Sequence, residues 1–195
     1  MGLFDRSNKK SLLKKANKLF NQNKYQEALK CYNEILEIDS NYVKAWYGKS
    51  IIFHELKEYE NALNCFDKVT NLDPKSVEGW YNKGVVLGKL DKYDDAIKCF
   101  DKALELNSNF VQAWTYKGLV LAGNKKRLEA IECFDKALEI DSKNLDAWYN
   151  KGLTLVLIKE YQEAEQCFDK VLELDPNYKL ASNAKKMIPY STNIT

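Results

Sequence analysis

The chain has 195 residues, of which 45% are hydrophobic and 30% are charged, and its formal net charge is +2. With 8 glycines and 3 prolines, this composition excludes a collagen-like, low-complexity or disordered chain and is typical of a soluble folded protein. The longest apolar runs are a few residues, so we expect no transmembrane helix, no secretory signal and a cytoplasmic protein.

The charges are unevenly distributed along the chain. Residues 1–30 hold eight basic and two acidic residues, and residues 176–195 hold three basic residues and no acid. Residues 31–175 are left with 19 basic and 26 acidic residues, so no basic stripe follows the body of the chain to contact nucleic-acid phosphates. We therefore expect neither nucleic acid nor a membrane among the partners.

An internal repeat of 34 residues organises the sequence. This spacing separates successive cysteines and also successive tryptophans, and such a period is typical of helical units that stack on one another. The cysteines are Cys31, Cys65, Cys99, Cys133 and Cys167, and the tryptophans are Trp46, Trp80, Trp114 and Trp148.

Taken in chain order, the sequence predicts an N-terminal extension (1–8), five repeats, a capping helix (179–188) and a flexible tail (189–195). The repeats are 9–42, 43–76, 77–110, 111–144 and 145–178. Each repeat contains two segments with helical apolar spacing, separated by a short polar turn, and therefore predicts a helical hairpin. The apolar side predicted for the capping helix consists of Leu180, Ala184 and Met187 or Ile188.

Small residues mark the expected contact between the two helices of a hairpin. They stand four residues after the tryptophan position and are Ala16, Ser50, Gly84, Gly118 and Gly152. We expect them to face an alanine column in the second helix, formed by Ala28, Ala62, Ala96, Ala130 and Ala164. The cysteines lie beside the same apolar stripe, so we interpret them as packing residues; thiols that bind metal or sense oxidant are the alternative.

These patterns resemble the tetratricopeptide repeat. The resemblance covers residues 9–178 and rests on segments such as Trp80-Tyr81-Asn82-Lys83-Gly84 and Tyr93-Asp94-Asp95-Ala96-Ile97. It implies an all-α fold, a right-handed superhelix of five helix-turn-helix repeats whose first helices line a concave groove. Arg127 departs from the tyrosine of the other turns and is expected to loosen the fourth hairpin.

A column of lysines also departs from the family pattern. Its members are Lys15, Lys49, Lys83, Lys117 and Lys151. We interpret them as stems that lie on apolar surface with solvated ammonium groups, and a recognition ridge is the alternative.

The resemblance also implies which positions face a ligand in the groove. They lie one, two, five and eight residues after the tryptophan position, and in the first repeat they include Leu13, Asn17 and Phe20. The candidate partner-binding residues are Tyr47, Ile51, His54, Tyr81, Asn82, Val85, Tyr116, Leu119, Tyr149, Asn150 and Leu153. The tyrosines are the strongest candidates because amphipathic rings are favoured at interfaces, while the aliphatic residues are equally well explained by packing between helices.

A known use of this fold is a clamp for a peptide's terminal carboxylate, which needs lysine and arginine at fixed groove positions. No run of three repeats supplies these cations; the first run offers Leu13, Asn17, Gly48, Glu78 and Asn82. We therefore expect an adaptor that binds an apolar or aromatic segment of another protein, extended or helical. The alternative is a structural unit that forms homo-oligomers through its groove or end cap. We expect no catalysis, cofactor or metal, because no acid/base, phosphate-binding or ligand cluster remains outside the repeat columns.

Overall fold

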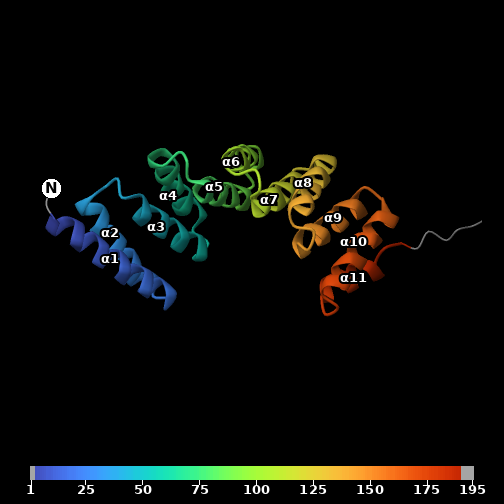
Figure 1. The fold of residues 1–195 in the computed structure, drawn as a ribbon, viewed down its shortest axis with the longest axis horizontal. Helices are drawn as coiled ribbons and strands as arrows, with labels where there is room; N and C mark the ends of the chain where they lie inside the picture. The colour runs from blue at the N-terminus through green and yellow to red at the C-terminus, as the bar shows by residue number, and fades with distance from the viewer. Residues whose placement is uncertain (1–2, 190–195) are drawn as a thin grey trace, which may run out of the picture. The chain divides into compact units, whose positions relative to one another are not determined.

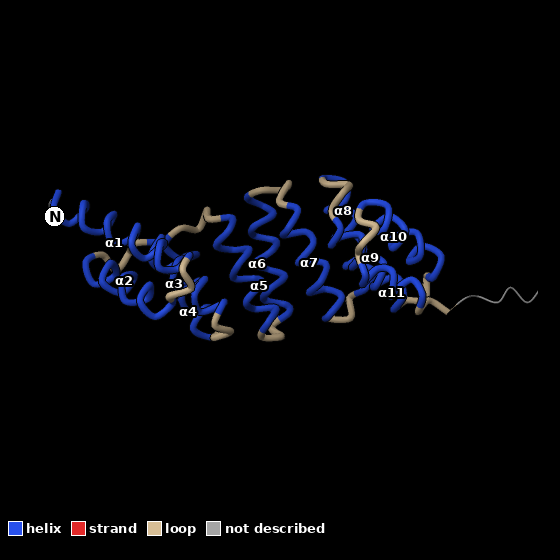
Figure 2. The backbone as a smooth tube through the Cα atoms, turned by 90° about the horizontal axis from the view of Figure 1, so that it is seen from below, coloured by secondary structure: helices blue, strands red, loops and turns tan. Residues whose placement is uncertain are grey.

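The part of the chain that the structure describes is entirely helical. The computed structural model describes residues 3–189, with side chains from residue 8, and within this range it contains eleven α-helices and no strand (Figures 1 and 2). The helices are α1 (Leu3–Asn21), α2 (Tyr25–Ile38), α3 (Val43–Glu55), α4 (Tyr59–Leu72), α5 (Val77–Lys89), α6 (Tyr93–Leu106), α7 (Val111–Gly123), α8 (Arg127–Ile140), α9 (Leu145–Leu157), α10 (Tyr161–Leu174) and α11 (Lys179–Lys186). The predicted all-α fold of consecutive helix pairs is confirmed.

The chain divides into two compact units. The N-terminal unit contains α1 to α6 and ends at Leu106, and the C-terminal unit begins at Asn107 and contains α7 to α11. In the N-terminal unit α1 packs on α2, α3 on α4 and α5 on α6. In the C-terminal unit α7 packs on α8, α9 on α10, and α11 covers α10. Helix α1 begins at Leu3, inside the segment predicted as an extension.

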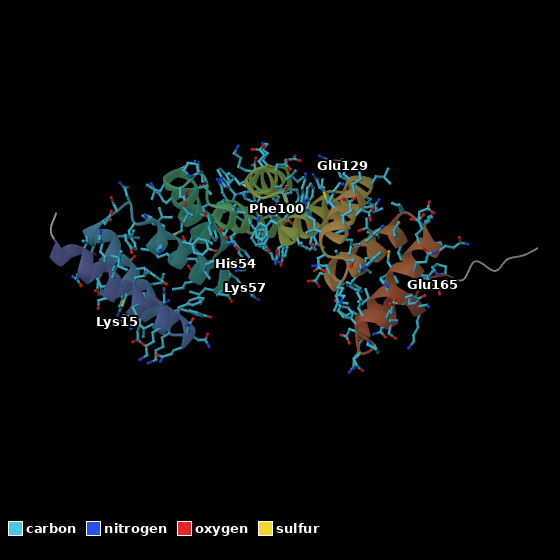
Figure 3. The ribbon with its side chains drawn as sticks, viewed as in Figure 1. Lys15, His54, Lys57, Phe100, Glu129 and Glu165 are labelled. Carbon is cyan, nitrogen blue, oxygen red and sulfur yellow. The ribbon has the colours of Figure 1, made fainter. Side chains whose placement is uncertain are left out.

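The small residues of the first helices face phenylalanine rings of the second helices. A Cβ added to Gly84, Gly118 or Gly152 would lie 2.6–2.9 Å from Cε1 of the phenylalanine sixteen residues later, which is Phe100 for Gly84 (labelled in Figure 3). The prediction that these glycines face the alanine column is therefore wrong. The alanines are fully buried elsewhere in the same interfaces, and the glycines make room for an aromatic ring instead.

The tryptophans hold the loops between repeats. Each indole Nε1 donates a hydrogen bond of 2.8–2.9 Å to the backbone carbonyl six residues earlier, as in Trp46 to Ser40 and Trp80 to Pro74. An Asp or Asn at the start of each of these loops accepts a backbone N–H two residues later at 2.9–3.2 Å. The loop is thus closed at both ends by side chains that recur every 34 residues.

The turn inside each hairpin contains one residue with a left-handed backbone. These residues are Asn23, Lys57, Asp91, Lys125 and Lys159, with φ between 56° and 69°. Asparagine and aspartate adopt this conformation at low cost, whereas lysine does not. The fourth turn has the same geometry as the others, and α8 begins at Arg127 where the other second helices begin at tyrosine.

We predict that glycine at the three lysine positions stabilises the protein. Lys57→Gly, Lys125→Gly and Lys159→Gly each remove a clash between Cβ and the backbone, and each is expected to raise the free energy of unfolding by about 0.5–1 kcal/mol. Urea unfolding followed by circular dichroism measures the gain. The control is Lys89→Gly, at the end of α5 with regular helical geometry, which is expected to lower stability. A loss in all four variants would contradict the prediction.

The lysine column connects neighbouring repeats. Lys83 forms an ion pair with Asp67 (2.8 Å), Lys151 forms one with Asp135 (2.5 Å), and Lys49 donates a hydrogen bond to Asn33 (2.8 Å). Each of these ammonium groups also lies 5.1–5.9 Å from the centre of the tryptophan ring three residues earlier. The predicted solvated ammonium groups are therefore wrong for these three residues, which bind the preceding second helix.

Helix α11 has the features of a sixth first helix without its partner. Lys185 continues the lysine column and pairs with Asp169 (2.6 Å) and Glu165 (3.2 Å). Lys186 stands where Gly152 admits a phenylalanine ring, so a second helix has no room to pack in the usual way.

The buried side of α11 differs from the predicted one. Ala181 is buried, and Ala184 and Ile188 pack on the core, as predicted for these last two residues. Leu180 and Met187 are 58% and 81% exposed, so their predicted place on the apolar side is wrong. The helix ends at Lys186, and the predicted tail from residue 190 onward lies outside the described residues.

All five cysteines are buried in the helix interfaces, as the packing interpretation predicts. Burial raises the pKa of Cys99 and of Cys167 to about 11, although Lys83 and Lys151 act in the opposite direction. A redox or metal-binding thiol needs a lowered pKa, so the geometry favours packing.

This burial predicts a loss of stability at alkaline pH. An unfolded thiol has a pKa of about 8.5, so between that value and about 11 the unfolded chain releases a proton that the folded chain keeps. The contribution is constant below pH 8.5 and is lost as the pH rises through this window. Urea unfolding between pH 7 and 11 should show a steeper decline for the parent than for a Cys99→Ala/Cys167→Ala variant. Equal slopes would show that these thiols do not contribute.

Candidate functional site

The N-terminal unit contains an open hollow of about 650 Å³ between its first helices. This volume lies in the range of ligand-binding pockets. Helices α1 and α3 form the two sides, α2 contributes one aromatic ring, and the loop before α5 closes one end. The lining residues are Leu13, Asn17, Phe20, Tyr32, Val43, Lys44, Tyr47, Gly48, Ile51, Asp73 and Ser76.

Gly48 and Tyr32 define the floor of the hollow. Gly48 stands two residues after Trp46, where the other repeats carry lysine, asparagine or tyrosine. A Cβ at this position would collide with the ring of Tyr32. Tyr32 replaces the phenylalanine of the other repeats, and its hydroxyl donates a hydrogen bond to Asn17 Oδ1 (2.7 Å). Burial raises the pKa of Tyr32, so this donor stays protonated at neutral pH.

Tyr47 forms a wall of the hollow and is held by the next repeat. Its hydroxyl accepts a hydrogen bond from Asn82 Nδ2 (2.9 Å), and the same amide donates to the carbonyl of Glu78 (2.8 Å). Its ring meets Phe66 edge-on, with 5.9 Å between centroids. Burial, together with the nearby charge of Glu78, raises the pKa of Tyr47. The structure therefore fixes this ring in place before any ligand binds.

The other candidates in the N-terminal unit do not line the hollow. Tyr81 packs on Phe100 with 6.0 Å between centroids, and Val85 is partly buried. His54 lies at the end of α3, near Lys57 (both labelled in Figure 3), with its ring 5.9 Å from that of Tyr59. His54 Nε2 is buried without a hydrogen-bond partner among the described residues, and Nδ1 lies 3.6 Å from Glu55.

The candidates in the C-terminal unit form a separate stripe on α7 and α9. Tyr149 packs between Phe168 and Tyr178, at 6.0 and 5.5 Å between centroids. Asn150 donates to the carbonyl of Asp146 (2.7 Å), and Leu153 packs on the core below. Tyr116 is 37% exposed and Leu119 is partly buried. Several of these side chains therefore also stabilise the unit itself.

The sequence did not identify every residue of the hollow. Tyr32, Val43, Lys44, Gly48, Asp73 and Ser76 line it but were not among the candidates. The best available signal was Gly48, the single glycine in a column of larger residues, because a missing side chain in a groove position leaves a depression.

Two further observations concern the described residues only. Residues 3–189 contain no helix that is both long and apolar enough to cross a membrane. Within the same range, no group of three or more His, Cys, Asp or Glu side chains is arranged to hold a metal ion.

Comparison with protein families finds matches along most of the chain. The model described as tetratricopeptide repeat matches residues 10–42, 77–110 and 145–178, a second tetratricopeptide repeat model matches 111–144, and one described as TPR repeat matches 52–91. A comparison with curated proteins found no match.

Solved structures of similar fold include proteins of known name. The crystal structure of YrrB, described as a TPR protein with an unusual peptide-binding site, is 31% identical with a TM-score of 0.78 and covers 90% of this chain and 91% of its own. MamA from Desulfovibrio magneticus RS-1 is 24% identical with a TM-score of 0.82, covering 88% and 97%. PilF from Pseudomonas aeruginosa is 18% identical with a TM-score of 0.75, covering 96% and 95%. The last two show the fold alone.

Proposed function

The chain belongs to the tetratricopeptide repeat family, and on this premise we propose that it is a non-catalytic adaptor that binds a segment of a partner protein in the hollow between α1 and α3. Proteins of this family are interaction scaffolds. The cytoplasmic location expected from the sequence remains a prediction.

The hollow of the N-terminal unit carries this proposal. Its sides are apolar, formed by Leu13, Phe20, Val43, Tyr47 and Ile51, and its tyrosines are fixed by hydrogen bonds and ring contacts. A preformed apolar surface binds with little loss of side-chain entropy. The peptide-binding site in the description of YrrB, 31% identical over nine-tenths of this chain, supports a peptide as the ligand class.

The ligand is not expected to be a terminal carboxylate held in a clamp. In the N-terminal unit the clamp positions for cations carry Leu13 and Glu78, and Asn82 is engaged with Tyr47. Affinity then comes from apolar side chains that enter the hollow.

A selection from a displayed library of random nonapeptides tests the proposal on the full chain. Peptides should be enriched by the parent protein and lost in Leu13→Trp, in which an indole extends into the hollow. The control is Glu34→Trp, which adds the same side chain to the exposed face of α2 and should select the same peptides as the parent. If no peptide separates the parent from Leu13→Trp, the hollow is not a peptide site.

Self-assembly remains a second candidate because α11 exposes Leu180 and Met187. Large exposed apolar side chains at the end of a repeat array are suited to contact with another copy. Sedimentation velocity across a hundredfold range of concentration tests this candidate. Self-association that Leu180→Lys/Met187→Lys abolishes would support it, and a monomer at every concentration would exclude it.

A further inference from the structure

Most polar groups around the hollow are already satisfied within the protein. Asp73 Oδ1 accepts the backbone N–H of Lys75 (3.2 Å), Ser76 Oγ accepts that of Gly79 (3.1 Å), and Asn17 Oδ1 accepts the hydroxyl of Tyr32. Lys44 is the exception, because it lines the hollow and has neither a hydrogen bond nor an ion pair through its side chain within the described residues. The polar capacity that remains for a ligand is therefore cationic.

Two further lysines extend this charge along α1. Lys10 and Lys14 stand three residues before Leu13 and Asn17, so they are neighbours of these lining residues on the helix surface. Both are exposed and without an ion pair to any described side chain. Lys9, in contrast, is used by the fold, since its ammonium group pairs with Asp39 (2.6 Å) and lowers the pKa of that carboxyl group.

The repeat pattern confines the positive charge to one end of the hollow. Lys10 and Lys44 occupy the same repeat position, and the next residue at this position is Glu78. The charge of Glu78 reaches Tyr47, because it contributes to the raised pKa of that phenol. The edge formed by α1 and α3 therefore attracts carboxylates, and the edge toward α5 repels them.

We propose that the hollow binds an acidic peptide segment, whose bulky apolar side chain enters between Leu13, Tyr47 and Ile51 while its carboxylates pair with Lys10, Lys14 and Lys44. This inference rests on the proposed function and adds the charge and orientation of the ligand. The apolar side chain supplies most of the affinity, and the lysines supply selectivity and a dependence on salt.

The same nonapeptide selection tests this charge preference. Peptides enriched by the parent protein are expected to carry a net negative charge and at least one large apolar residue. One enriched peptide, labelled with fluorescein, is then titrated with the parent, with Lys10→Gln/Lys14→Gln/Lys44→Gln, and with the control Lys24→Gln/Lys30→Gln/Lys68→Gln. The control removes the same charge from exposed lysines outside the lining of the hollow.

The lysines of the hollow should weaken binding by roughly tenfold or more when replaced, if each pair contributes as exposed ion pairs usually do. The control should bind within about twofold of the parent, and 0.5 M NaCl should remove most of the difference between the variants. Circular dichroism checks that all three proteins are equally folded.

Each other outcome has a definite meaning. Enriched peptides that are neutral or basic, or equal binding by both triple variants, overturn the charge assignment while the peptide site stands. No enrichment over Leu13→Trp overturns the proposed function and this inference with it. Acidic peptides that still bind Leu13→Trp, or a single-stranded DNA 12-mer that competes equally well, would show a general anion-binding surface and overturn the inference.

Discussion

Phe100→Ala is expected to lower the free energy of unfolding by about 3–5 kcal/mol, as truncation of a fully buried aromatic ring usually does. The ring is 0% exposed, lies against Gly84 of α5, and meets Tyr81 at 6.0 Å between centroids. Gly84 has no side chain that can fill the space, so the cavity would remain. Because each repeat is stabilised mainly by its neighbours, the loss should spread from α5 and α6 to the second repeat.

Urea unfolding measured by circular dichroism at 222 nm gives the size of this effect. The control is Phe20→Ala, which truncates a partly exposed ring at the edge of the hollow and should cost about half as much or less. Similar losses for the two variants would contradict the view that the pairing of glycine with phenylalanine is the central contact of each hairpin.

The fold was predictable because one chemical pattern recurs five times. A single apolar spacing is weak as a signal, but Trp46 and its counterparts combine it with a fixed period, and the structure shows why: each indole closes the loop that precedes its helix. Contacts across a hairpin were less predictable. The sequence shows that Gly84 and Ala96 are both small, but only the helix rotation in space decides that Gly84 faces Phe100.

The candidate site was predictable only in part because its position depends on exceptions to the repeat. Tyr47 and Ile51 follow the column rule and line the hollow, whereas Tyr81 and Val85 follow the same rule and do not. The difference comes from Gly48 and Tyr32, which change the surface of one repeat only. The lysine column shows the same limit, because the aspartates that pair with Lys83 and Lys151 belong to the preceding repeat, sixteen residues away.

The α11 cap illustrates how a local pattern can mislead. Leu180 and Met187 fit an apolar stripe at helical spacing, but the contacts of α11 follow the register of the preceding first helices. Ala181 matches Ala147, and Lys185 matches Lys151, at intervals of 34 residues. The repeat register thus predicted the buried side of this helix better than its own hydrophobicity did.

The second large effect is expected at the floor of the hollow. Gly48→Asn introduces the residue found at this position in the third and fifth repeats, but its Cβ would collide with the Tyr32 ring. We expect a loss of about 1–3 kcal/mol in the free energy of unfolding, as for other overpacked sites, and loss of peptide binding. The control is Gly123→Asn, at the exposed end of α7, which should change stability by less than about 0.5 kcal/mol.

A double-mutant cycle with Tyr32→Phe separates this collision from a general intolerance of asparagine. Tyr32→Phe alone removes the hydrogen bond to Asn17 and should cost about 0.5–1.5 kcal/mol. Phe66 and Asn82 coexist at the corresponding positions of the next two repeats, so a phenylalanine ring has a place beside asparagine there. Gly48→Asn should therefore cost less in the Tyr32→Phe background than alone, with a coupling of about 1 kcal/mol. Costs that simply add would show that the Tyr32 ring is not what selects glycine at position 48, and that the hollow has another origin.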